Sequence, residues 1–339
     1  MAGRPDPRVN SRRAAILLWF GGGALFAWIV LAQDWGRLGP ALAGTGWGLV
    51  AIAAFHLLPL LADTRAWDCL LRAAPVRPAF ARLCWMRWLG ESVNSLLPAA
   101  QVGGDLLRGR LSQRAGVPGV LAAAVILVDL TLSVATLVPF ILTGVLLAWL
   151  GAPQAATLTS LAGGLLLGAA GLGGFVLLQH SGLVGRLLAR LAQLLGGNAF
   201  ERGAVTAASL NDAITGLYRR PALAWRSAGW ALLAWFLGAG EVWLALHFLG
   251  VDAGWREALV LEALFQAIRN AAFLVPGALG VQDGGIMLVA ALAGVGPESA
   301  LLVSLLKRGR ELLLGLPGLL AAWLTLAAER GAGHLTADR

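Results

Sequence analysis

Long apolar runs alternate along the chain with short polar segments that are rich in arginine. A bilayer core about 30 Å thick takes about 20 helical residues to cross, so each long run predicts a transmembrane helix. The run that begins at Val117 could continue to Leu150 with a kink at Pro139. The predicted fold class is all-α, a polytopic helical membrane protein with about six transmembrane helices. The predicted helices cover residues 14–32, 47–62, 117–139, 155–178, 222–249 and 297–328.

Two stretches break the apolar pattern. Residues 91–114, ESVNSLLPAAQVGGDLLRGRLSQR, place carboxylates, an amide and arginines next to Pro98 and to a pair of glycines that begins at Gly103. Residues 269–294 repeat this mixture around Pro276. Proline and glycine interrupt helices, and non-helical backbone is tolerated in a bilayer where it is buried in protein or lines a cavity. We therefore predict two re-entrant broken helices that line a cavity.

The two broken stretches belong to an internal repeat. An offset of 178 residues aligns Pro98 with Pro276 and Asp105 with Asp283, and it gives 10 identities over 39 positions. In the predicted topology the two copies cross the membrane in opposite directions, as the inverted repeats of alternating-access transporters do. The predicted organisation is a single integral membrane domain over 1–339, with a first repeat at 47–139, a cytoplasmic amphipathic linker at 180–221 and a second repeat at 222–328.

Composition and charge support this class. The chain is 58% hydrophobic and 13% charged, which excludes an ordinary soluble protein. Its net charge of +8 indicates arginine-rich cytoplasmic loops, not nucleic-acid binding, and the distribution of arginine and lysine along the chain favours both termini in the cytoplasm. The first apolar run could also be a signal peptide, although its length favours a transmembrane helix. The segments predicted to be cytoplasmic, with 20 of the 26 arginines and lysines, are 1–13, 63–118, 180–226 and 330–339.

Catalytic and metal-binding chemistry has little support in the sequence. Cys69 and Cys84 make no metal-ligand pattern, and no nucleophile or nucleotide-binding motif is present. We interpret both cysteines as packing residues and expect no catalytic residue, no metal and no cofactor. The histidines are scattered without ligand spacing and are interpreted in the same way; they are His56, His180, His247 and His334.

Charged residues inside apolar runs are costly and often mark a substrate or proton path. The repeat aligns Glu91 with Arg269, and Asp129 with Lys307, the only lysine of the chain. Such residues could meet near the midplane, as structural ion pairs or as a gate. Arginine suits phosphate, although Arg108 could equally anchor the chain at the cytoplasmic surface. The candidate substrate-binding residues are Glu91, Asn94, Asp105, Arg108, Arg269, Asn270, Asp283 and Arg308, and the candidate gating or ion-pair residues are Asp129 and Lys307.

These stretches carry a family resemblance. In one segment, Leu-Pro is followed by Gly-Gly-Asp and then by an arginine. These residues are Leu97, Pro98, Gly103, Gly104, Asp105 and Arg108. A second segment, Pro-Gly-x-x-Gly followed by an acidic residue, is present from Pro276 to Asp283, where the family more often has glutamate. An arginine of the family's final helix matches Arg308 or Arg310. The chain thus resembles the flippase-like transmembrane family of lysylphosphatidylglycerol synthase. Its first segment is most similar to the hopanoid-biosynthesis-associated, HpnL-like branch of Gram-negative bacteria.

The resemblance implies a multi-pass protein of the bacterial cytoplasmic (inner) membrane that moves or accommodates lipids. We expect a lipid transporter or flippase, not an enzyme, that moves an anionic phospholipid or a hopanoid-type lipid by alternating access. A soluble aminoacyltransferase domain is not expected. The alternatives are an intramembrane lipid-modifying enzyme that uses Glu91 or Asp105 as acid or base, and a scaffold for lipid-biosynthesis enzymes. The expected partners are membrane lipids, with lipid-biosynthesis enzymes in the scaffold alternative, and no nucleic acid.

Overall fold

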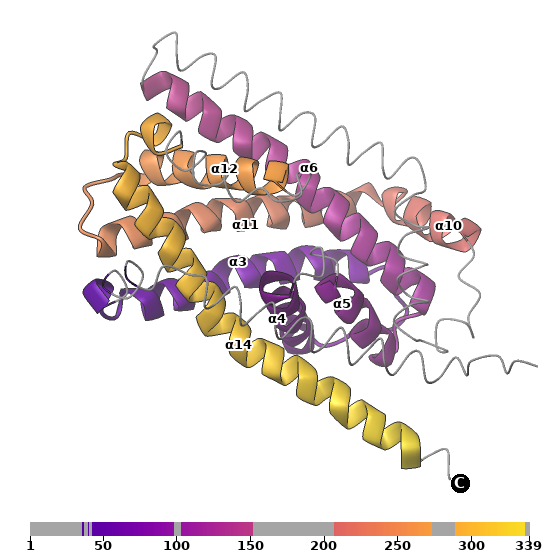
Figure 1. Ribbon diagram of the computed structural model, residues 1–339. Coiled ribbons are helices and arrows are strands. Elements are labelled where there is room, and N and C mark those ends of the chain that lie inside the picture. The colour runs from indigo at the N-terminus through magenta and orange to yellow at the C-terminus, as the bar shows by residue number, and fades with distance from the viewer. Residues whose placement is uncertain are drawn as a thin grey trace, which may run out of the picture.

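The computed structural model describes residues 43–97, 103–151, 207–272 and 289–335, together with Gly36 and Pro40. Regular structure within these ranges is helical (Figure 1). The longer helices are α3 (Gly48–Leu71), α4 (Phe80–Leu96), α5 (Gly103–Arg114), α6 (Gly119–Gly151), α10 (Ala207–Tyr218), α11 (Pro221–Phe248), α12 (Trp255–Ala272) and α14 (Pro297–Leu335).

Four helices among the described residues are long and apolar enough to cross a membrane: α3, α6, α11 and the Pro297–Ala327 part of α14. They confirm the prediction of an all-helical, multi-pass membrane protein. α6 continues through Pro139 to Gly151, so the longer alternative for this run is the observed one. The predicted helices at 14–32 and 155–178 lie outside the described residues.

The first broken stretch forms a helical hairpin. α4 has 17 residues and α5 has 12, fewer than the roughly 20 that cross a bilayer. α4 ends at Leu96, and Leu97 is extended because the ring of a following proline disfavours helical backbone. α5 then folds back onto α4, so closely that a Cβ on Gly104 would overlap the carbonyl group of Gly90. The side-chain oxygen of Asn94 accepts a hydrogen bond of 2.7 Å from the Gly104 N–H and fixes this turn.

Equivalent helices of the two predicted repeats run in opposite directions. α6 begins at Gly119 and α14 begins 178 residues later, at Pro297. Figure 1 shows α6 and α14 crossing the molecule in opposite senses, and α3 and α11 lying side by side in opposite senses. These are the directions that an inverted repeat requires. The part of the second broken stretch at 273–288 lies outside the described residues.

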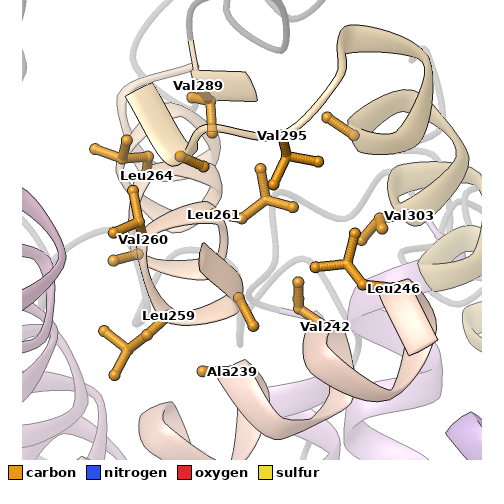
Figure 2. Packing of buried hydrophobic residues seen from close by; sticks show 14 of the residues in the cluster. Ala239, Val242, Leu246, Leu259, Val260, Leu261, Leu264, Val289, Val295 and Val303 are labelled. Carbon is orange, nitrogen blue, oxygen red and sulfur yellow. The ribbon is translucent and has the colours of Figure 1, made fainter. Parts of the chain in front are cut away.

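The apolar core is divided into two clusters. One joins α11, α12, the start of α14 and the second half of α6, and Figure 2 shows side chains such as Val242, Leu261 and Val303 pointing toward one another. The other joins α3, α4, α5 and the first half of α6 around Trp67, and it includes Leu217 of α10, which lies in the predicted linker.

Polar residues lie between the two clusters along individual helices. On α3, Ile52 belongs to the first cluster and Trp67 to the second, and His56 and Asp63 lie between them. On α6, Asp129 occupies the same position between residues of the two clusters. On α3 and α6 these residues form a polar layer between the two apolar clusters.

The close crossing of α4 and α5 leads to a testable prediction. We expect Gly104→Ala to destabilise the protein by about 3 kcal/mol, because the added methyl group overlaps backbone that cannot move away without opening the hairpin. Gly109→Ala on the same helix is the matched control, since its new Cβ would meet no atom closer than Ile126 Cγ1 at 4.0 Å. Alanine in place of an interior helical glycine should be neutral or stabilising by up to about 1 kcal/mol. Thermal unfolding of the detergent-purified variants measures the difference, and equal melting temperatures would contradict the crossing.

Candidate functional site

A cavity of about 330 Å³ lies within the polar layer, lined by α3, α4, α5, α6, α11, α12 and α14. Its walls carry both signs of charge, with more carboxylates than cations. The acidic lining residues are Asp63, Glu91, Asp105, Asp129, Glu241, Glu262 and Glu311, and the basic ones are Arg87, Arg108, Arg269, Lys307 and Arg310, with His56 between them.

Four of these residues meet at one point, and we call them the central quartet: His56, Glu91, Glu241 and Arg310. His56 Nδ1 lies 2.8 Å from Glu241 Oε2, and His56 Nε2 lies 2.7 Å from Glu91 Oε1. Arg310 Nε lies 2.9 Å from Glu241 Oε1, and Arg310 Nη1 lies 2.8 Å from His56 Nε2. The side chain of Glu91 is 36% exposed, whereas that of Glu241 is 2% exposed. The quartet therefore joins α3, α4, α11 and α14, and one of its carboxylates faces the cavity.

A second group, the hairpin cluster, consists of Asp63, Arg87, Asp105, Arg108 and Asp129. Arg108 donates to Asp105 Oδ1 at 2.5 Å and to Asp129 Oδ2 at 3.1 Å. Arg87 donates to Asp129 Oδ2 at 3.0 Å and forms an ion pair with Asp63 at 3.0 Å. Buried charges need such partners, because an unpaired ion in a low-dielectric interior is strongly destabilising. The cluster thus attaches the hairpin of α4 and α5 to α3 and α6.

Two further ion pairs connect α12 with α14. Lys307 donates to Glu262 Oε2 at 2.5 Å, and Gln266 donates to the other oxygen of that carboxylate at 2.8 Å. Arg269 Nη1 lies 3.4 Å from Glu311 Oε1. Within the described part of the chain, no group of three or more His, Cys, Asp or Glu side chains could hold a metal ion.

The structure brings most of the predicted site residues to the cavity. Asn94 contributes the hydrogen bond that fixes the hairpin turn. Arg108 is buried in the hairpin cluster, where it binds Asp105 and Asp129. Arg308 is exposed and does not line the cavity, and the side chain of Asn270 and all of Asp283 lie outside the described residues. The predicted residues that line the cavity are Glu91, Asn94, Asp105, Arg108, Asp129, Arg269 and Lys307.

The expected meeting of Asp129 with Lys307 does not occur. Asp129 binds Arg87 and Arg108, and Lys307 binds Glu262. The expected approach of equivalent residues fails because Asp129 and Lys307 each find a partner within the same predicted repeat. Among the described residues, ion pairs between the two predicted repeats occur only in the central quartet.

Sequence reasoning selected Glu91 among the quartet residues and offered Arg310 only as an alternative to Arg308. It assigned His56 no functional role, whereas in the structure both ring nitrogens of His56 contact carboxylates. Glu241 and Arg310 lie within predicted transmembrane runs, where any ionisable residue signals function or pairing. That signal was available for Glu241 and Arg310. A single histidine in an apolar run offers no comparable spacing signal.

Comparison with known proteins agrees with the resemblance seen in the sequence. The family model described as "Lysylphosphatidylglycerol synthase TM region" matches residues 14–318 of the chain. All residues that line the cavity fall within the matched range. Comparisons with curated proteins and with solved structures found no match.

The ion pairs predict a pattern of energetic coupling. Replacing one partner of a buried pair leaves the other charge unmatched, so Glu262→Gln and Lys307→Met should each destabilise by about 3 kcal/mol. Because the two side chains touch, the double variant should lose less than the sum, with a coupling energy of about 1–3 kcal/mol. Asp129→Asn combined with Lys307→Met should be additive, since each residue has a different partner.

Unfolding of each variant by SDS in mixed micelles gives the free energies for both cycles. The exposed carboxylate of Asp252 supplies the control, and Asp252→Asn should leave stability within about 0.5 kcal/mol of the parent protein. A coupling between Asp129 and Lys307 as large as that between Glu262 and Lys307 would show that the assigned partners are incorrect.

Proposed function

The chain belongs to the lysylphosphatidylglycerol synthase TM-region family, and on this premise we propose that it is a lipid transporter of the bacterial cytoplasmic membrane. Family membership and the apolar helices make it a membrane protein related to lipid metabolism. The proposal adds the activity: it moves the polar headgroup of an amphipathic lipid, an anionic phospholipid or a hopanoid-type lipid, through the charged cavity. Both termini would lie in the cytoplasm.

The observation that carries the proposal is a charged cavity inside helices whose outer faces are apolar. α3 directs His56 and Asp63 to the cavity, whereas its leucines Leu57, Leu58 and Leu61 are exposed. A volume of about 330 Å³ is at the lower end of the range of small-ligand sites, about 300–1,000 Å³. The cavity therefore suits a headgroup, and acyl chains would remain beside the apolar helix faces.

The cavity wall provides both kinds of contact that a polar headgroup needs. Arg108 of the hairpin cluster contacts both Asp105 and Asp129. A phosphate could compete with these carboxylates for Arg108. Hydroxyl or amino groups of a headgroup could be accepted by the partly exposed carboxylate of Glu91. A lipid would then exchange with existing ion pairs, so no isolated charge would be left behind when the site empties.

The pairing pattern also supports alternating access. Most ion pairs of the cavity lie within one repeat, so each repeat could move as a unit and keep them. The central quartet joins the two repeats and would rearrange during such a motion. We therefore assign the gate to the quartet instead of to Asp129 and Lys307.

A second candidate function is favoured by one observation. Glu91 is partly exposed to the cavity and contacts His56, an arrangement that could transfer a proton to or from a bound lipid. This would make the protein an intramembrane lipid-modifying enzyme. Mass spectrometry of lipids incubated with the protein separates the two, because an enzyme changes the mass of a lipid and a transporter does not.

The transport proposal is tested in proteoliposomes that contain a fluorescent phosphatidylglycerol on both leaflets, with dithionite added outside. With the protein present, dithionite should quench more fluorescence than that of the outer leaflet alone, because labelled lipid from the inner leaflet reaches the outer one. Arg87→Gln should slow this by at least about 10-fold, because Asp63 and the buried Asp129 lose their shared partner and the cavity wall changes. Arg82→Gln removes an exposed arginine from the same helix and should transport like the parent protein.

Size-exclusion profiles and melting temperatures of both variants show whether a loss of transport reflects unfolding. Quenching that stops at the outer leaflet with the parent protein, for phosphatidylglycerol and for a hopanoid-type probe, would refute transport of these lipids. Equal rates for Arg87→Gln and Arg82→Gln would show that the cavity is not the route.

A further inference from the structure

The contacts of His56 with its two carboxylates require one proton more than two ionised carboxylates and a neutral histidine carry. A carboxylate accepts hydrogen bonds and cannot donate, so each ring nitrogen of His56 that contacts one must carry hydrogen. His56 Nδ1 contacts Glu241, and His56 Nε2 contacts Glu91, at 2.8 and 2.7 Å. A neutral imidazole has a single N–H. These two contacts together require an imidazolium, or a proton on one of the two carboxyl groups.

A third contact requires the opposite. Arg310 Nη1 lies 2.8 Å from His56 Nε2. A guanidinium nitrogen can only donate, so this contact is a hydrogen bond only when His56 Nε2 carries no hydrogen. Nε2 therefore has two competing partners at hydrogen-bond distance. Glu91 is the partner of the protonated nitrogen, and Arg310 is the partner of the bare nitrogen.

The partners of the quartet also leave room for rearrangement. Glu241 Oε1 and Arg310 Nε are buried and 2.9 Å apart, yet neither atom makes a hydrogen bond to the described residues. Unmade hydrogen bonds between buried polar groups are costly. The arrangement therefore satisfies neither state of the histidine fully.

Exposure indicates how a proton would reach this site. The side chain of Glu91 is 36% exposed, whereas the side chains of Glu241 and Arg310 are 2% and 7% exposed. Glu91 therefore connects His56 with the cavity. Among the other charged groups that line the cavity from α3 and from the helices packed against it, each has an ion-pair partner among the described residues; they are Asp63, Arg87, Asp129, Lys307 and Glu311.

We propose that His56 is a proton-binding site that couples protons to the opening of the cavity. With its proton, His56 donates to Glu91 and Glu241 and holds α4 against α3 and α11. When the Nε2 proton passes to Glu91 and on to cavity water, His56 keeps its Nδ1–H bond to Glu241 and accepts one from Arg310 at Nε2. The Glu91 carboxylate is then free to bind a headgroup, so lipid and proton compete for it. This inference rests on the proposed transport function.

The proton site is tested without transport, by NMR of the detergent-solubilised protein labelled with ¹⁵N-histidine. The His56 signals are identified by their loss in His56→Gln. In the parent protein, both ring nitrogens should be protonated at low pH, and Nε2 alone should lose its proton as the pH rises. Glu91→Gln should shift His56 to the neutral form with hydrogen on Nδ1, and Arg310→Gln should hold it in the protonated form.

Transport in proteoliposomes tests the coupling. The parent protein should change its rate of fluorescent phosphatidylglycerol movement by about 10-fold between about pH 6 and pH 10, within the usual range of coupling between sites. His56→Gln should lose this dependence, because the amide fills the site without titrating. His247→Gln should keep it, since His247 is exposed on α11 and stacks on Trp243.

The outcomes separate the two proposals. A His56 that does not titrate between those pH values, or that is unaffected by Glu91→Gln and Arg310→Gln, overturns the proton site even if lipid moves. A titrating His56 with pH-dependent transport retained in His56→Gln overturns the coupling. Lipid that does not move, with His56 titrating as described, overturns the transport function and leaves the proton site standing.

Discussion

The cost of an ionised side chain inside a membrane protein decides which helices meet in this structure. Glu241 and Arg310 lie on spanning helices and are nearly fully buried, so each needs an opposite charge close by. The partners come from other helices, and the contact between Arg310 and His56 joins residues that are 254 positions apart. In a chain this rich in leucine, alanine and glycine, apolar packing alone distinguishes weakly between neighbours. The buried charges supply that distinction.

Small residues make these charge contacts possible. A side chain as short as aspartate reaches a partner only where helices approach closely, and small residues permit that approach. The hairpin depends on Gly90 and Gly104, and α14 lies so close to α4 that a Cβ on Gly318 would overlap Ser92. Trp88 of α4 also donates a hydrogen bond of 3.1 Å to the carbonyl of Leu314. Close approach and charge pairing are thus two parts of one arrangement.

The sequence predicted the elements better than the contacts between them. Run length identified the spanning helices, and Pro98 with its neighbouring glycines identified the break between α4 and α5, because these features act locally. The partner of Asp129 depends on the rotation of α6 and on the reach of two arginines on other helices. An alignment of repeats places residues at equal depth but does not give helix rotation. His56 shows the same limit, since its carboxylates lie 35 and 185 residues away.

The distribution of ion pairs limits how the two repeats could move. A motion of one repeat against the other would keep the pairs within each repeat, such as Arg108 with Asp129 and Lys307 with Glu262, and would have to remodel the central quartet. In the quartet, Glu91 is the carboxylate that faces the cavity, and it lies on α4 of the helical hairpin. The quartet therefore carries both the ion pairs between the two predicted repeats and a carboxylate that is open to the cavity. In the proposed transport function, binding of a headgroup and release of the ion pair between Glu91 and Arg310 would not be independent events, because both would use the same carboxylate.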